Sequence, residues 1–130
     1  MSQEFDPQVM NALRRIIDQV VAPDLALPEH PRDGDCLDWA PRITTHLKSA
    51  GIAAATVTVI GWTNRATKVL VFVHLATHID GGVMVDGTAR QFSPAFPPLL
   101  VTTLSNYCAK LAELTGVAEV SVELDPTDLS

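Results

Sequence analysis

The feature that most constrains the fold is a pair of valine- and threonine-rich segments joined by a glycine turn. The first, TKVLVFVHLATHI, ends at Ile79, and the second, VMVDGT, begins at Val83, with DGG between them. β-Branched residues favour strands, and glycine permits the positive φ angles of a tight turn. A three-residue loop with a glycine in the left-handed region would place Ile79 opposite Val83 and His78 opposite Met84. These segments therefore predict an antiparallel hairpin.

Further helices and strands are expected on both sides of this hairpin. Apolar residues recur at helical spacing over residues 7–21, and a second helix is expected from about 35 to 50, with Gly51 as its left-handed cap. AAATVTVIGW reads as a strand, residues 99–114 resume a helical pattern, and VAEVSVEL offers a last strand. This order predicts an α+β fold around an antiparallel sheet, formed by a single domain over residues 1–130.

Two details constrain the elements further. Pro41 lies too deep in the second helix for the first helical position, which predicts a kink or a short irregular turn around Cys36. The segment 67–79 is apolar on both faces, which is typical of a central strand that is covered on both sides.

Composition and charge exclude several classes of partner. Fifteen acidic against nine basic residues give a net charge of −6, so we expect no nucleic-acid partner. No apolar run approaches the roughly 18 residues of a membrane span, and the N-terminus lacks the features of a signal peptide. We therefore expect a soluble protein made in the cytoplasm. Its two cysteines are too few for a structural zinc site and are expected to be reduced thiols.

The segment RDGDCLDWAP places Cys36 at the expected start of the second helix. The positive end of the helix dipole and the unpaired backbone N–H groups there stabilise a thiolate, and the same N–H groups can hold an oxyanion. Asp33, Asp35 and Asp38 oppose this effect unless they point away or act as caps, because nearby negative charge raises the pKa of a thiol.

His74 and Asp86 are candidate partners of this thiol. The expected hairpin register places Ala76 opposite Asp86, so that Asp86 lies diagonal to His74 on the same face of the sheet. A carboxylate there can hold the imidazole in one tautomer. A two-residue loop would instead turn Asp86 to the other face. Asp86 is also diagonal to His78, so geometry alone leaves the choice of histidine open.

Other roles for these residues remain open at this point. His74, His78 and Asp86 could together bind a metal ion, since alternate residues of one strand face the same way. Asp86, which precedes a glycine and a threonine, could cap its own turn. Cys36 could be a buried core residue, which is the role expected for Cys108 in its amphipathic helix.

The motifs GDC, LKSAGI and HLATHIDGGVMVDGTARQF together resemble the papain-like and transglutaminase-like cysteine enzymes. The ending DGTARQF is similar in particular to small bacterial papain-fold toxin and deamidase domains. The resemblance implies a papain-like fold in which an antiparallel sheet packs against the helix that bears the nucleophile. It also implies a triad of Cys36 as nucleophile, His74 as base and then acid, and Asp86 as the orienting group, with no metal or cofactor.

The resemblance further implies thiol-dependent amide hydrolysis, either deamidation of a protein glutamine or peptide cleavage, so the expected partner is a protein or peptide. Papain-type enzymes usually supply an oxyanion donor from a glutamine before the cysteine, whereas PRDGD offers none. We therefore expect the N–H of Cys36 to serve, with Trp39 or Gln91 lining the site. Transfer to an amine, a catalytically inactive binding module, delivery into a target cell and the oligomeric state all remain open.

Overall fold

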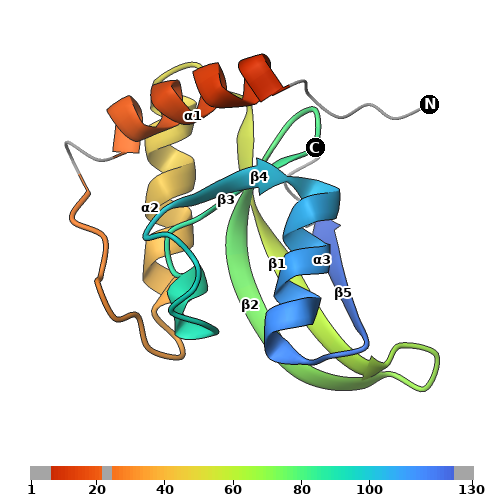
Figure 1. Cartoon of the computed structure of the whole chain (residues 1–130). Helices are drawn as coiled ribbons and strands as arrows, with labels where there is room; N and C mark the ends of the chain where they lie inside the picture. The colour runs from red at the N-terminus through yellow and green to blue at the C-terminus, as the bar shows by residue number, and fades with distance from the viewer. Residues whose placement is uncertain (1–6, 22–24, 125–130) are drawn as a thin grey trace.

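The protein is described by a computed structural model that covers residues 7–21 and 25–124. These residues form an α+β arrangement of helices and strands, as the sequence predicts (Figure 1). In chain order the elements are α1 (Pro7–Val21), α2 (Cys36–Ser49), β1 (Ala54–Asn64), β2 (Val69–Ile79), β3 (Val83–Asp86), the short 3-10 helix η1 (Ala89–Gln91), β4 (Leu100–Thr103), α3 (Leu104–Thr115) and β5 (Glu119–Leu124).

The strands form one antiparallel sheet in the order β4-β3-β2-β1-β5. The hairpin between β2 and β3 has the register expected from its DGG turn, with Ile79 opposite Val83 and His78 opposite Met84. Gly81 and Gly82 adopt φ angles of 102° and 95°, which a residue with a Cβ rarely tolerates. This turn fixes which side chains of β3 share a face with those of β2.

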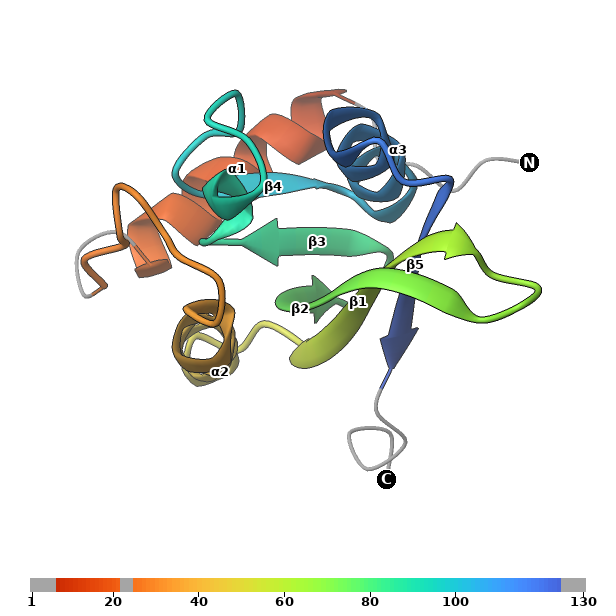
Figure 2. The ribbon, with the colours of Figure 1, turned by 90° about the horizontal axis from the view of Figure 1, so that it is seen from below.

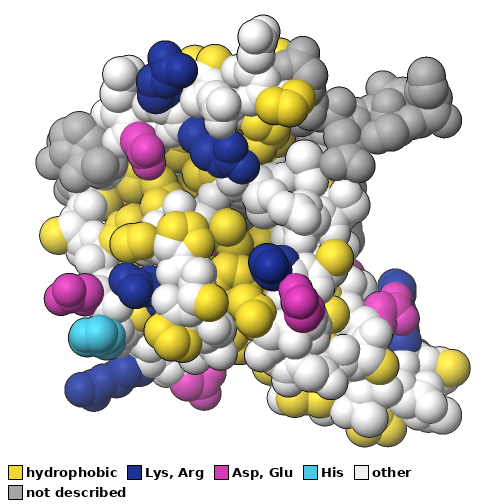
Figure 3. All heavy atoms as spheres, viewed as in Figure 1, with side chains coloured by type: hydrophobic (Ala, Val, Ile, Leu, Met, Phe, Trp, Pro, Cys, Tyr) yellow, Lys and Arg dark blue, Asp and Glu magenta, His cyan; other side chains and the backbone are white. Residues whose placement is uncertain are grey.

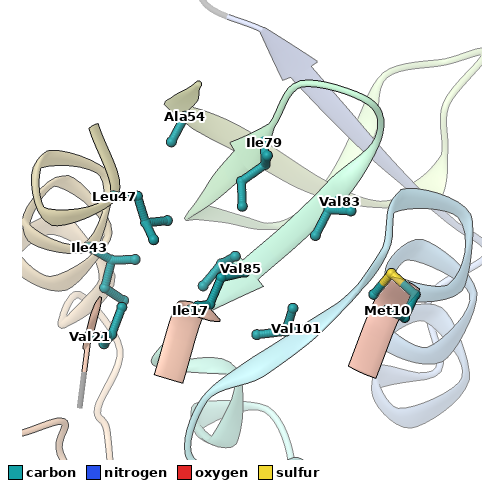
Figure 4. Close-up of a cluster of buried hydrophobic side chains, with 10 residues drawn as sticks. All are labelled: Met10, Ile17, Val21, Ile43, Leu47, Ala54, Ile79, Val83, Val85 and Val101. Atoms are coloured by element: carbon teal, nitrogen blue, oxygen red, sulfur yellow. The ribbon is translucent and has the colours of Figure 1, made fainter. Parts of the chain in front are cut away.

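Apolar side chains fill both faces of the sheet. On one face α1 and α2 pack over alternate residues of β3, including Val83 and Val85 (Figure 4). On the other face Tyr107 and Leu111 of α3 pack with Met84 of β3. Figure 2 shows α2 and α3 standing apart with strands between them. Because a strand turns alternate side chains to opposite faces, β2 and β3 contribute to both packed layers.

A cluster of threonine hydroxyls joins α2 to the sheet. Thr44 Oγ1 of α2 lies 2.8 Å from Thr56 Oγ1 of β1 and 2.9 Å from Thr77 Oγ1 of β2. Thr77 also donates to the carbonyl oxygen of Ala40 at 3.3 Å. Buried hydroxyl groups need such partners, so the cluster favours one position of α2 along β2. The cluster thereby fixes the position of Cys36 on α2 relative to His74 on β2.

The last predicted helix was assigned too long at its N-terminal end. Residues 100–103 form strand β4, which pairs with β3, and α3 begins only at Leu104. Thr103 ends the strand and caps the helix, with its side-chain oxygen accepting from the N–H of Asn106 at 3.2 Å. Leu99 and Leu100, the apolar pair before Val101, fit the periodicity of a helix and that of a strand equally well. Pairing with β3 makes residues 100–103 a strand.

The expectation that the second strand is covered on both faces is wrong for its first half. Val69, Leu70, Val71 and Val73 are 50%, 51%, 55% and 54% exposed. β3 pairs only with residues 77–79 of β2. The outer half of the hairpin that β1 and β2 form therefore extends beyond the strands and helices that cover the rest of the sheet. Figure 3 shows hydrophobic side chains on the surface of this projecting hairpin, at the lower right.

Pro41 does not interrupt α2, which runs unbroken from Cys36 to Ser49. The irregular backbone lies instead in the turn of residues 33–35, just before the helix. Pro41 has no N–H to donate to the carbonyl of Leu37, a residue that is 65% exposed, so water can satisfy that oxygen. Among the helices of the described residues, none combines the length and the apolar character that crossing a membrane requires.

Candidate active site

Cys36 is the first residue of α2, and its side chain is 5% exposed. The turn before it is closed by Asp35, whose Oδ2 accepts from the N–H of Arg32 at 2.8 Å. The Asp35 side chain makes no capping hydrogen bond to the helix. The Cys36 thiol therefore lies at a helix N-terminus whose backbone N–H groups are not capped by the side chain of Asp35.

The backbone N–H of Cys36 is available at this end of the helix. The next three N–H groups donate to the carbonyl oxygens of Gly34 and Asp35 at 3.1 Å. Within residues 7–21 and 25–124, no acceptor takes the N–H of Cys36. One free donor thus lies next to the thiol, where the sequence predicts an oxyanion site.

His74 and Asp86 meet across the hairpin as the register predicts. The Nε2 atom of His74 lies 2.8 Å from Oδ2 of Asp86, and both side chains are about 1% exposed. Phe92 packs against the imidazole in an edge-to-face arrangement, with ring centroids 4.9 Å apart. The carboxylate and the aromatic ring together fix the orientation of the imidazole.

The Asp86 carboxylate receives three further hydrogen bonds. Its Oδ1 accepts from the N–H and the hydroxyl of Thr88, at 2.8 and 3.3 Å. Its Oδ2 accepts from the hydroxyl of Tyr107 at 2.7 Å. Burial raises the pKa of Asp86, but the charge of His74 and these hydrogen bonds outweigh burial and lower it. Asp86 thus caps its own turn and holds His74 at the same time.

Gly87 allows this turn to lie close to α2. A Cβ atom at Gly87 would come within 2.7 Å of Ile43 and 2.9 Å of Leu27, distances that real Cβ contacts almost never show. Both contacts are terminal methyl groups, so the turn after Asp86 packs against the side chains of Ile43 in α2 and Leu27 in the preceding loop, which would have to shift to admit a Cβ atom.

His74 also interacts with Cys36. Because Nε2 is held by Asp86, Nδ1 is the ring nitrogen left for the thiol, and it makes no hydrogen bond of standard geometry in the described part of the chain. Burial lowers the pKa of His74, but the charge and hydrogen bond of Asp86, followed by the Cys36 interaction, raise it to about 9. The imidazole therefore favours its protonated form at neutral pH.

The pKa of Cys36 moves in the opposite direction. Burial raises it, but the interactions with His74 and with the backbone N–H of Leu75 outweigh burial and lower it below its ordinary value of 9.0. Asp86 opposes this shift through its negative charge. Both shifts favour a thiolate beside an imidazolium, which is the reactive form of a cysteine nucleophile.

The aspartates beside Cys36 have less effect on the pKa of its thiol than the sequence suggests. Asp33 and Asp38 are exposed, and Asp35 is bonded back to Arg32. The charged groups that shift the pKa of Cys36 are His74 and Asp86. Solvent exposure and the bond to the preceding turn account for this difference.

The remaining sequence candidates lie outside this hydrogen-bonded group. His78 is half-buried, and burial lowers its pKa against the effect of Asp80. Cys36 and Cys108 are both free thiols, and burial raises the pKa of Cys108. No cluster of three or more His, Cys, Asp or Glu side chains in the described ranges is arranged to hold a metal ion.

Trp39 and Gln91, the expected lining residues, are both half-buried. The guanidinium of Arg42 lies over the Trp39 ring, 5.1 Å from its centroid. Gln91 lies in η1, five residues after Asp86, and its Oε1 atom is buried without a hydrogen-bond partner among the described residues. A buried and unpaired amide oxygen of this kind calls for an explanation, so Gln91 is the stronger of the two candidates.

Sequence reasoning does not identify Tyr107, the residue before Cys108, as part of the site. Its side chain is fully buried, and its hydroxyl joins α3 to Asp86 of β3. The one available signal was general, since a buried tyrosine hydroxyl usually has a hydrogen-bond partner. The identity of that partner depends on how α3 packs on the sheet.

No model of a known protein family and no curated protein sequence matches this chain. Among solved structures, it is similar to the C-terminal region of Pasteurella multocida toxin, described as having a thiol-protease-like catalytic triad. The TM-score is 0.68 at 17% sequence identity, over 91% of this chain and 18% of the toxin chain. The protein therefore has a thiol-protease-like α+β fold, as its resemblance to papain-like enzymes implies, and it spans less than a fifth of that solved chain.

Proposed function

We propose that this chain is a cysteine hydrolase that cleaves amide bonds through Cys36, His74 and Asp86. The observation that carries the proposal is the arrangement of the three groups. A thiol at a helix N-terminus interacts with a buried imidazole, which a buried carboxylate holds at 2.8 Å. The pKa shifts of Cys36 and His74 both favour the thiolate–imidazolium pair. The thiol-protease-like fold supports the same reaction type.

In the first step the Cys36 thiolate attacks the carbonyl carbon of the substrate amide. The C–S bond forms as the carbonyl π electrons move to oxygen, which gives a tetrahedral oxyanion. His74 then donates its proton from Nδ1 to the amide nitrogen, and the C–N bond breaks to release ammonia or an amine. The products of this step are a Cys36 thioester and a neutral imidazole.

In the second step water resolves the thioester. The neutral His74 accepts a proton from water, and the oxygen attacks the thioester carbon. The C–S bond breaks, which returns the sulfur to a thiolate and leaves a carboxylic acid on the substrate. Asp86 stays ionised throughout and stabilises the imidazolium that exists before and after each turnover.

The oxyanion requires donors, and the proposal assigns two. The free N–H of Cys36 lies beside the sulfur at the start of α2. The second is proposed to be the Nε2–H group of the Gln91 side-chain amide, the other end of which, Oε1, is buried and unpaired among the described residues. Trp39 is proposed only to line the entrance, since Arg42 covers its ring.

Among amide substrates we favour the side chain of a protein glutamine. The segment DGTARQF resembles the deamidase branch of papain-fold domains, and the similar solved structure belongs to a bacterial toxin. Hydrolysis of a glutamine side chain would leave the target chain intact and convert one carboxamide to a carboxylate. Delivery into a target cell would accord with this substrate.

The open edge of β2 supports a peptide as the bound group. β3 pairs only with residues 77–79, so no strand of the described ranges pairs with this edge over residues 69–75. Leu75 turns its N–H to Cys36, and Val73, two residues earlier, presents its backbone to the same edge. An extended peptide can add to such an edge through main-chain hydrogen bonds. Its path would end at the nucleophile.

The test is mass spectrometry of glutamine-containing proteins and peptides after incubation with the chain in heavy-oxygen water. Deamidation places a heavy oxygen in a glutamine side chain, whereas peptide cleavage places it at a new C-terminus. Transfer to an added amine instead joins two masses. Hydroxylamine added during turnover should release the acyl group from Cys36 as a hydroxamate, because it attacks thioesters.

The matched control is Cys36→Ser, which replaces one atom of the nucleophile and should abolish all three products. The proposal fails if oxygen incorporation is as fast with Cys36→Ser as with the unaltered chain. It also fails if no substrate is altered and Cys36 is inert toward alkylating reagents, the result expected of a binding module that has lost its chemistry.

A further inference from the structure

Tyr107 reaches the candidate site from α3, an element that carries none of the three proposed catalytic groups. Its side chain is fully buried, and its hydroxyl donates to Oδ2 of Asp86 at 2.7 Å. The same oxygen faces Nε2 of His74 at 2.8 Å. Tyr107 and His74 thus converge on one carboxylate oxygen, while Thr88 holds the other.

The hydroxyl is a permanent donor in this position. Burial raises the pKa of Tyr107 well above its ordinary value of 10.0, and the negative charge of Asp86 raises it further. The phenol therefore keeps its proton at neutral pH. A hydrogen bond from a neutral donor to a buried carboxylate stabilises the charged form of that carboxylate.

The geometry also restricts how Asp86 can move. With Thr88 on Oδ1 and Tyr107 on Oδ2, rotation of the carboxylate about its last torsion would break hydrogen bonds at both oxygens. Without the hydroxyl, Oδ2 would keep one partner among the described residues, His74, which is the group that Asp86 has to orient. A buried oxygen with fewer donors is also a less stable anion.

We propose that Tyr107 is a positioning residue, which anchors the Asp86 carboxylate so that Oδ2 remains ionised and faces Nε2 of His74. The inference rests on the proposed function of Cys36, His74 and Asp86, and it adds α3 to the elements that this function requires. Tyr107 itself touches neither the substrate nor the reacting atoms in this scheme. Its effect is transmitted through Asp86 and then through the imidazole.

The test replaces the hydroxyl and keeps the ring. In Tyr107→Phe we expect the pKa of Asp86, followed by carbon NMR of its labelled carboxyl group, to rise relative to the unaltered chain. We expect the downfield proton signal of the His74 Nε2–H group to broaden, because the less restrained carboxylate lets this proton exchange faster. Turnover of an amide substrate should fall about tenfold in kcat with little change in KM, since one hydrogen bond to a charged group is lost.

Leu111→Val is the matched control. Leu111 is also fully buried on α3, one turn beyond Tyr107, and none of its atoms can hydrogen-bond to Asp86. This variant should lower stability and leave the Asp86 pKa and the His74 signal unchanged. An equal loss of kcat in both variants, with no change in the Asp86 titration, would show that Tyr107 only packs α3 and would overturn the inference.

The two NMR readouts need no substrate, so the inference and the proposed function can fail separately. If the unaltered chain hydrolyses no amide, the proposed function fails, while a raised Asp86 pKa in Tyr107→Phe still supports the anchoring role. If the chain is active and Tyr107→Phe matches it in kcat, Asp86 titration and His74 signal, the inference is overturned and the proposed function stands.

Discussion

Four hydrogen bonds converge on the Asp86 carboxylate from a threonine backbone, a threonine hydroxyl, a tyrosine and a histidine. A buried carboxylate would otherwise be strongly unfavourable as an anion. The hairpin supplies His74, the turn supplies Thr88 and a distant helix supplies Tyr107. The charge on Asp86 is thus a product of the fold, and its effect reaches Cys36 through the imidazole.

The His74–Asp86 pair predicts how stability depends on pH. The pKa of His74 is raised from 6.5 to about 9, so its contribution is fully present below pH 6.5 and is lost as the pH rises toward 9. The pKa of Asp86 is lowered from 3.8, so its contribution is present above pH 3.8 and is lost as the pH falls. The pair should therefore stabilise the fold most between pH 3.8 and 6.5.

This prediction is measured by urea unfolding across the pH range, with and without His74→Gln. Both chains carry Cys36→Ser, because the thiol has a lowered pKa and its contribution to stability would rise with pH while that of His74 falls. The difference in unfolding free energy should decrease above pH 6.5, with a slope of at most about 1.4 kcal/mol per pH unit. A difference that stays constant up to pH 9 would contradict the raised pKa of His74.

At the scale of elements, the threonine cluster predicts that the position of α2 affects Cys36. Thr44→Val keeps the shape of the side chain but removes the hydroxyl that Thr56 and Thr77 share. We expect a loss of about 1–3 kcal/mol in unfolding free energy, because buried hydroxyls lose a partner. Urea unfolding measures this loss, and the rate of Cys36 alkylation should fall as α2 shifts.

Thr45→Val is the control for this prediction, since Thr45 is exposed on the same helix. It should leave both stability and the alkylation rate close to those of the unaltered chain. Equal effects of the two substitutions would mean that the loss reflects the helix propensity of valine and not the hydroxyl cluster.

The elements that the sequence predicted well are those with strong local signals. The DGG turn determines the register of β2 and β3, so the sequence alone places Asp86 and His74 on one face of the sheet. α1 and β5 also follow their periodic patterns. Which histidine Asp86 holds was settled only by the resemblance in the sequence, and the structure agrees with His74.

The elements and contacts that were missed depend on packing between distant segments. β4 has only four residues, too few to be told from a helix start by periodicity, and its pairing with β3 decides its structure. Tyr107 lies 21 residues from Asp86, so no local spacing connects them. The exposure of the outer half of β2 likewise follows from the shortness of β3 and not from the composition of β2.

At the scale of the whole molecule, the site draws on both layers that pack against the sheet. Cys36 comes from α2 on one side, whereas Tyr107 comes from α3 on the other, and β2 and β3 carry His74 and Asp86 between them. Figure 1 shows the outer half of the β1–β2 hairpin projecting away from this assembly. The projecting edge is the surface that the proposed function assigns to an extended peptide.

This assignment predicts a substitution that affects substrate binding alone. Val73→Lys places a charge on the exposed edge, one residue before His74, where the side chain is 54% exposed. For a protein substrate we expect kcat/KM to fall about tenfold, the equivalent of one lost apolar contact or backbone pairing. Alkylation of Cys36 by a small reagent should be unchanged, because the triad is left intact.

Ile16→Lys serves as the comparison, since Ile16 is 49% exposed on α1, away from β2. It adds the same charge and should leave kcat/KM unchanged. If Val73→Lys also leaves kcat/KM unchanged, or if both substitutions lower it equally, the edge of β2 is not where the peptide binds.

The central claim, that Cys36 and His74 form a thiolate–imidazolium pair, is tested most directly by the pH dependence of Cys36 alkylation. The chain carries Cys108→Ser, so that Cys36 is the one thiol present. Iodoacetamide should modify Cys36 with a midpoint below the ordinary thiol pKa of 9.0, and His74→Ala should raise that midpoint and slow the reaction at neutral pH. A midpoint at or above 9.0 that His74→Ala leaves in place would contradict the account.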